Sequence, residues 1–106
     1  MNWQDDLERI KTLSENWDSY GASEIDHQVI CRVNMLMLFM EELDLEFPIM
    51  LPNVRGGIDL QWDEFELTIH PGPRFEYCSR DLEVIENFYV SPSKAYSLIL
   101  KHLGEK

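Results

Sequence analysis

Basic residues are scarce in this 106-residue chain, which has nine lysines and arginines against twenty aspartates and glutamates. The formal charge of −11 disfavours direct binding to DNA, RNA or anionic lipid, because such binding uses Lys and Arg to neutralise phosphates. The most apolar stretch, residues 33–40, is far too short to span a bilayer. The N-terminus has no basic region followed by an apolar run, so we expect no signal peptide and a cytoplasmic protein.

Cysteine and histidine are also few, and their spacing matches no catalytic or metal-binding pattern. Cys31 and Cys78 form no C-x-x-C motif, so we expect two free and mostly buried thiols. His27, His70 and His102 fall on different elements, and no pair is spaced i, i+4. Cys31 lies one helical turn after His27, but no glycine loop that could stabilise an oxyanion precedes it. We therefore predict no catalytic residue, no metal and no cofactor.

Apolar residues at helical spacing predict two helices in the N-terminal half. The first begins near Trp3 and extends to Trp17, with acidic residues in its first turn. The second covers residues 24–43, and Ser23 followed by Asp26 three residues later resembles a capping box at its start.

The second helix is apolar almost all round between residues 35 and 40. A helix of this kind must be covered on two sides. The sheet, the first helix or a second copy of the protein could supply the cover. The residues that we assign to a dimer surface on this helix are Met35, Leu38 and Phe39.

Alternation of apolar and polar residues at period two predicts an antiparallel meander in the middle of the chain. The predicted strands are, in chain order, residues 49–51, 58–62, 65–70 and 75–78, with a further strand beginning at residues 82–85. Two of them join in a tight hairpin at Asp63-Glu64. Pro48 and Pro52 bracket the first strand, which favours an edge position.

A C-terminal helix follows, with Ser91 as N-cap, Pro92 in the first turn and Gly104 at the end. Helices and strands that segregate along a chain indicate an α+β fold. We predict one domain over residues 1–106: two N-terminal helices, an antiparallel meander of three to five strands and a C-terminal helix. The helices should cover one face of the sheet and leave the other open.

Three short motifs accompany this pattern: N-W-D-S-Y-G-A at residues 16–22, P-I-M-L-P at 48–52 and G-G-I-D-L-Q-W at 56–62. Together they resemble a broad group of small, uncharacterised bacterial and phage-borne proteins, which show N-W-D-x-Y-G-A between two helices, then P-x-x-x-P, then G-G-I-x-L-x-W opening a meander. The resemblance covers residues 7–77. It implies the same architecture and a mobile-element or small-operon context, and no activity. We expect the motif residues to be structural, with Gly56-Gly57 permitting a bulge or close approach.

The polar side of the predicted meander is mostly acidic, and it is the best indicator of function in the sequence. The candidate partner-binding residues are Asp59, Gln61, Asp63, Glu64, Glu66 and Glu76, which we expect on one face with Thr68 among them. Carboxylates two residues apart on a strand stand about 6.5–7 Å apart, comparable to successive phosphates of one nucleic-acid strand. Such a row could occupy the nucleic-acid channel of another protein.

These observations predict a non-enzymatic protein that binds and inhibits a basic, nucleic-acid-binding partner as a nucleic-acid mimic. A phage-type inhibitor of host defence such as an anti-CRISPR fits best, and an antitoxin or immunity protein of a small operon is an alternative. Two other classes stay open. One is a homodimeric structural or assembly protein, and the other is a small enzyme that uses His70 with neighbouring carboxylates.

Overall fold

The computed structural model describes residues 3–19, 21–72, 74–79 and 87–104. Its elements are, in chain order, α1 (Trp3–Lys11), α2 (His27–Glu42), β1 (Ile49–Pro52), β2 (Ile58–Gln61), β3 (Phe65–His70), β4 (Arg74–Ser79), β5 (Asn87–Val90) and α3 (Pro92–Leu103). The α+β class and the antiparallel meander are confirmed, because the five strands lie side by side in sequence order with every pair antiparallel. The strand start predicted at residues 82–85 lies outside the described residues. Strand β5 is described from Asn87 to Val90.

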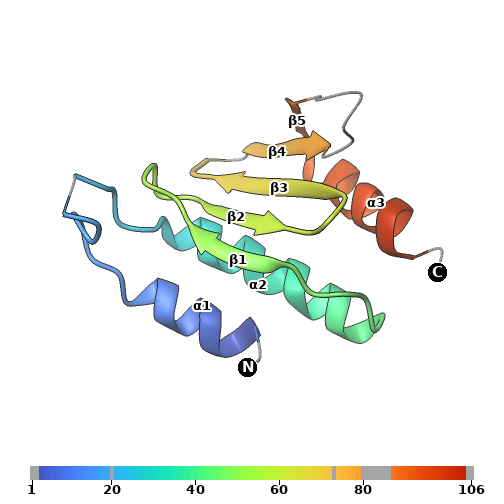
Figure 1. The fold of residues 1–106 in the computed structure, drawn as a ribbon, viewed down its shortest axis with the longest axis horizontal. Coiled ribbons are helices and arrows are strands. Elements are labelled where there is room, and N and C mark those ends of the chain that lie inside the picture. Colours follow the sequence, from blue (N-terminus) through green and yellow to red (C-terminus); the bar gives the residue numbers. More distant parts are fainter. Residues whose placement is uncertain (1–2, 20, 73, 80–86, 105–106) are drawn as a thin grey trace.

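The sheet lies in front of α2 and α3 in Figure 1, and α1 runs beside α2 next to β1. Strand β3, in the middle of the sheet, contacts α2, and β4 contacts α3. The predicted hairpin between β2 and β3 is present, and Trp62 N–H donates to the Phe65 carbonyl at 2.9 Å to close it. No helix in the described part of the chain is long and apolar enough to cross a membrane.

The hydrophobic core forms between the sheet and the helices because alternate strand residues point towards the helices. On the three central strands these buried residues are Ile58, Leu60, Phe65, Leu67, Ile69, Phe75 and Tyr77. They belong to one cluster with Val33, Leu36, Met37 and Met40 of α2 and with Ala95, Leu98 and Ile99 of α3. Burying one such side chain stabilises the fold by about 1.5–3 kcal/mol.

The first helix is shorter than predicted, since α1 ends at Lys11 and Trp17 lies in the following loop. Asn16 has a φ of 63°, which a right-handed helix does not allow, and its side-chain Oδ1 accepts the Gly21 N–H at 2.6 Å. Its backbone N–H also donates to the Ala22 carbonyl at 2.7 Å. Asparagine competes with helical hydrogen bonds in this way, and the local turn therefore replaces the last predicted turns of helix.

The start of the second helix also differs from the prediction. Asp26, and not Ser23, is the N-cap of α2, because its carboxylate accepts the Gln28 N–H at 2.8 Å. Ser23 N–H instead donates to the Val54 carbonyl at 2.9 Å, and Asp26 N–H donates to the Gly56 carbonyl at 3.0 Å. These two bonds attach the segment before α2 to the loop between β1 and β2.

The loops that contain the first and third motifs therefore lie together, and their residues have structural roles. The Trp17 indole N–H donates to the Ser23 carbonyl at 3.0 Å, within the segment that contacts the β1–β2 loop. Gly57 lies so close to β3 that a Cβ there would stand 2.5 Å from the Ile69 carbonyl oxygen. Gly56 has a φ of 88°, a backbone conformation that favours glycine. The expected close approach at Gly56-Gly57 is confirmed.

Candidate functional site

The outer face of the sheet, which we define as the face turned away from α2 and α3, presents polar side chains in two cross-strand rows. Asp59 of β2 pairs with Thr68 of β3, and Thr68 pairs with Glu76 of β4. The next row contains Gln61, Glu66 and Cys78. All six residues are half-buried, in contrast to the buried apolar residues that alternate with them along the strands. The alternation read from the sequence therefore places these side chains correctly.

Four of the six candidate contact residues come together on this face: Asp59, Gln61, Glu66 and Glu76. Glu66 is diagonal to both Asp59 and Glu76, because it pairs with Gln61 on one side and with Cys78 on the other. Diagonal neighbours on adjacent strands stand about 7–8 Å apart. The three carboxylates thus form a triangle across three adjacent strands. The sequence had predicted a row of carboxylates instead.

The other two candidates, Asp63 and Glu64, lie in the β2–β3 turn at one end of the sheet. The Glu64 carboxylate is 3.4 Å from Nδ1 of His102 on α3, so it points towards the helices. Asp63 and Glu64 also line a small cavity of about 100 Å³ with His102. The expectation of a single acidic face is wrong for Glu64, because a turn residue does not follow the alternation of a strand.

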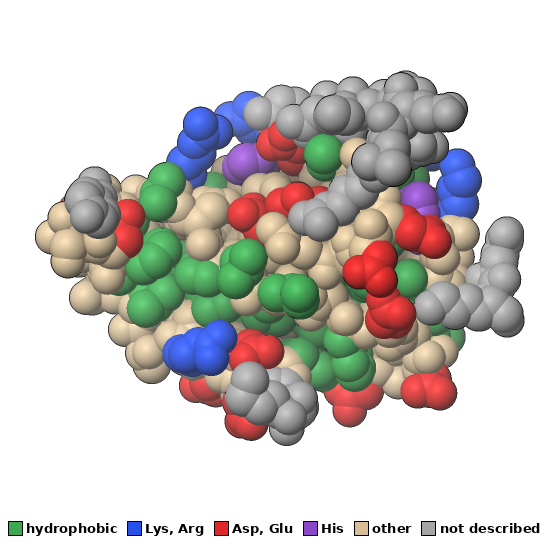
Figure 2. Space-filling view, in the orientation of Figure 1, with side chains coloured by type: hydrophobic (Ala, Val, Ile, Leu, Met, Phe, Trp, Pro, Cys, Tyr) green, Lys and Arg blue, Asp and Glu red, His purple; other side chains and the backbone are tan. Residues whose placement is uncertain are grey.

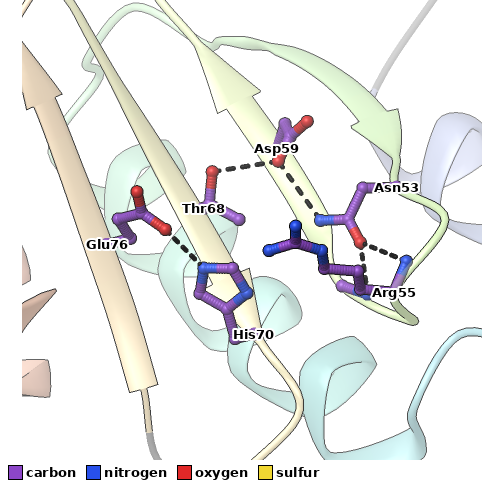
Figure 3. A network of polar contacts seen from close by, with 7 residues as sticks. Asn53, Arg55, Asp59, Thr68, His70 and Glu76 are labelled. Atoms are coloured by element: carbon purple, nitrogen blue, oxygen red, sulfur yellow. Dashed lines mark hydrogen bonds and ion pairs between the residues drawn. The ribbon is translucent and has the colours of Figure 1, made fainter. Parts of the chain in front are cut away.

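A network of polar contacts occupies the centre of the outer face (Figure 3). The Thr68 hydroxyl donates to Asp59 at 2.9 Å, and the Asn53 amide donates to the same carboxylate oxygen at 3.3 Å. Nε2 of His70 lies 2.7 Å from the Glu76 carboxylate. The contacts surround a shallow depression of about 200 Å³. They fix the directions of two carboxylates that would otherwise rotate freely.

The His70–Glu76 pair resembles the carboxylate-bound imidazole of general acid–base catalysts. His70 is only 14% exposed, however, and the nearby hydroxyl of Thr68 is directed to Asp59. A nucleophilic hydroxyl would have to be hydrogen-bonded to the histidine. Among the described contacts, the Thr68 hydroxyl is therefore bonded to Asp59, and the imidazole of His70 is bonded to Glu76.

Two arginines that the sequence analysis did not single out limit the acidic area. Arg74 pairs with His70 across the β3–β4 hairpin, and Arg55 lines the depression with its guanidinium reaching towards the network (Figure 3). Both lie at the opposite end of the sheet from Asp63 and Glu64. The outer face is therefore acidic towards the β2–β3 turn and basic towards the β3–β4 turn. The alternation that places Glu76 outward also places Arg74 there and would have identified it.

Exposed apolar side chains lie beside the carboxylates. Ile49 and Leu51 of β1 are 64% and 43% exposed, and Val54 in the next loop is 55% exposed. Ile49 pairs with Gln61, and Leu51 pairs with Asp59, so the apolar edge strand borders the acidic triangle directly. Figure 2 looks onto this face and shows apolar and acidic side chains exposed together on it. Adjacent apolar and charged side chains are typical of protein-binding surfaces.

The remaining candidates lie elsewhere. Cys31 is exposed and its Sγ is 3.8 Å from Nε2 of His27, so the prediction of a mostly buried thiol is wrong for it. Cys78 is half-buried, and both cysteines are free. Among the residues that the structure describes, no group of three His, Cys, Asp or Glu side chains is placed to hold a metal ion.

The residues assigned to a dimer surface lie on the side of α2 that does not face the sheet. Met35 and Leu38 are exposed, and Phe39 is half-buried against Tyr96 of α3 with the ring centroids 4.8 Å apart. Within one chain, the sheet, α1 and α3 all contact α2, and Met35 and Leu38 stay exposed.

Comparisons with protein-family models, with curated proteins and with solved structures found no match to this chain.

Proposed function

We propose that this protein is a non-enzymatic inhibitor that binds a basic, nucleic-acid-binding protein through the outer face of its sheet. In this proposal the helices cover the opposite face only, and the outer face stays open to the partner. The form that we favour is a phage-type inhibitor of host defence such as an anti-CRISPR. An antitoxin or immunity protein would use the same surface and would differ in the basic protein that it binds.

The observation that supports the proposal is the triangle of Asp59, Glu66 and Glu76 on three adjacent strands. Glu66 stands about 7–8 Å from each of the other two as their diagonal neighbour, a spacing that suits basic side chains that otherwise contact successive phosphates. The hydrogen bonds to Asp59 and Glu76 hold these carboxylates in place before binding, which lowers the entropy lost on association. Ile49 and Leu51 add apolar contact area next to the charges.

The charge distribution would also orient the partner. The net charge of −11 attracts a basic protein over a long range, while Arg55 and Arg74 repel it at one end of the outer face. A basic groove would therefore approach from the end near Glu66. Attraction of this kind raises the association rate and weakens with added salt.

The test uses neutral variants that keep the shape and most hydrogen bonds of the face. The triple variant Asp59→Asn, Glu66→Gln, Glu76→Gln removes three negative charges from the triangle. The matched control Glu8→Gln, Glu15→Gln, Glu24→Gln removes three from exposed positions outside the sheet. Each protein is immobilised and exposed to lysate of the native host, and captured proteins are eluted with short double-stranded DNA or with RNA.

We expect the wild type and the control to capture the same basic protein and nucleic acid to displace it. The triangle variant should retain less than about a tenth of the capture, because three lost charge pairs exceed 1.4 kcal/mol together. Circular dichroism should be the same for all three proteins. Equal capture by the triangle variant, or a partner that nucleic acid does not displace, would contradict the proposal.

A further inference from the structure

A cysteine and a histidine lie in contact on α2, in a groove that the proposed function does not use. The Sγ atom of Cys31 is 3.8 Å from Nε2 of His27, and both side chains are exposed. The groove lies between α1 and α2 and has a volume of about 250 Å³. Leu7 and Ile30 line it as buried apolar residues. A nucleophilic atom, a proton acceptor and a space beside them therefore occur together.

The helix itself positions the pair. His27 is the first residue of α2, after the Asp26 N-cap, and Cys31 follows it by four residues. Side chains at this spacing are neighbours on the same face of a helix. Cysteine is among the residue types that proteins bury most often. An exposed thiol next to an exposed imidazole is therefore an unusual placement for this residue.

The second cysteine has different surroundings and provides an internal comparison. Cys78 of β4 is half-buried, and its Sγ donates to the Ser79 carbonyl at 3.6 Å. A backbone carbonyl does not take up a proton at neutral pH, whereas an imidazole nitrogen does. Only one of the two thiols is thus both accessible and in contact with a base.

We propose that Cys31 is a modification site, which forms a mixed disulfide with a small disulfide compound while His27 takes up the thiol proton. Nε2 of His27 accepts the proton, and the Cys31 thiolate attacks one sulfur of the compound R–S–S–R. The S–S bond of the compound breaks, and a new bond forms between that sulfur and Sγ. The leaving thiolate R–S⁻ takes the proton from His27. The compound is itself the oxidant, so the step balances without another.

The groove defines the kind of group R that fits beside the thiol. Lys11 and Glu8 of α1 also line it, with Nζ of the lysine 3.3 Å from the carboxylate, so their charges offset one another. Apolar residues and an offset charge pair suit an uncharged or zwitterionic R group, such as that of an amino-acid disulfide. The site uses α1 and α2 only, and it does not depend on the proposed inhibition.

Reaction of the reduced full chain with bis(2-hydroxyethyl) disulfide, an uncharged small disulfide, tests the proposal. Intact-protein mass spectrometry near neutral pH follows formation of the adduct, and peptide mapping locates it. Cys78→Ser should react at the wild-type rate. Cys31→Ser should lose at least about nine-tenths of the initial rate, because the remaining thiol is half-buried.

His27→Gln tests the role of the histidine. Glutamine keeps a polar side chain but cannot take up the proton, so the reaction of Cys31 should slow at least about fivefold. Met35→Gln is the matched control, because Met35 is exposed and lies four residues after Cys31, as His27 lies four before it. It should react as the wild type does, and circular dichroism verifies that each variant is folded. An adduct located mainly on Cys78, or equal rates for His27→Gln and Met35→Gln, would overturn the proposal.

Discussion

The two faces of the sheet are built by the same strands and are stabilised in different ways. On the inner face, Phe65, Leu67 and Ile69 of β3 are completely buried against the helices. On the outer face of the same strand, Glu66, Thr68 and His70 remain half-buried among polar neighbours. Burial of apolar area determines the inner face, whereas hydrogen bonds and charge determine the outer one. We therefore expect inner substitutions to change stability and outer substitutions to change binding.

The largest effect should come from Phe65→Ala on the inner face. The Phe65 ring is fully buried and stacks on Trp62 and His102 at centroid distances of 4.4 and 4.2 Å. Its removal should lower the free energy of unfolding by about 3–5 kcal/mol, the usual cost of deleting a buried aromatic ring. Urea denaturation followed by circular dichroism measures the change.

Gln61→Ala is the matched control for Phe65→Ala, because Gln61 lies four residues away on the outer face. It should change the free energy of unfolding by less than about 0.5 kcal/mol. Similar losses from the two substitutions would show that the distinction between the faces is wrong.

A smaller effect, on the outer face itself, is expected from Thr68→Val. Valine keeps the shape of threonine but cannot donate to Asp59, which leaves that carboxylate with the 3.3 Å bond from Asn53. The free energy of unfolding should fall by about 1 kcal/mol, the net value of one hydrogen bond. In an Asp59→Ala background, which removes the acceptor, the same substitution should cost less, and a double-mutant cycle measures this coupling. Zero coupling would mean that the network in Figure 3 does not hold Asp59 in place.

Most of the sheet could be predicted from the sequence, because burial on one side imposes a strict period of two. Strand β3, the hairpin before it and the Ser91 cap of α3 were all predicted within a residue or so. The orientations of Asp59, Glu66 and Glu76 followed from the same period. A periodic signal of this strength leaves few alternative registers.

The parts that were predicted wrongly lie where no period applies. The loop after α1 depends on the positive φ of Asn16, and the N-cap of α2 is Asp26, in a segment whose Ser23 and Asp26 N–H groups both donate to the β1–β2 loop. Glu64 turned to His102, which lies 38 residues further along the chain. Contacts between distant segments fix the start of α2 and the direction of Glu64, and a local reading of one sequence does not contain them. The basic end of the outer face was not predicted, although the alternation that places Glu76 outward places Arg74 there as well.

The most direct test of the central claim is an amide NMR titration of the ¹⁵N-labelled protein with the basic protein that the capture experiment identifies. The account predicts that the largest chemical-shift changes fall on β2, β3 and β4, centred on Asp59, Glu66 and Glu76, and that added salt reduces them. Changes centred on the exposed side of α2 and α3, or on the loop that contains Trp17, with the three strands unaffected, would contradict it.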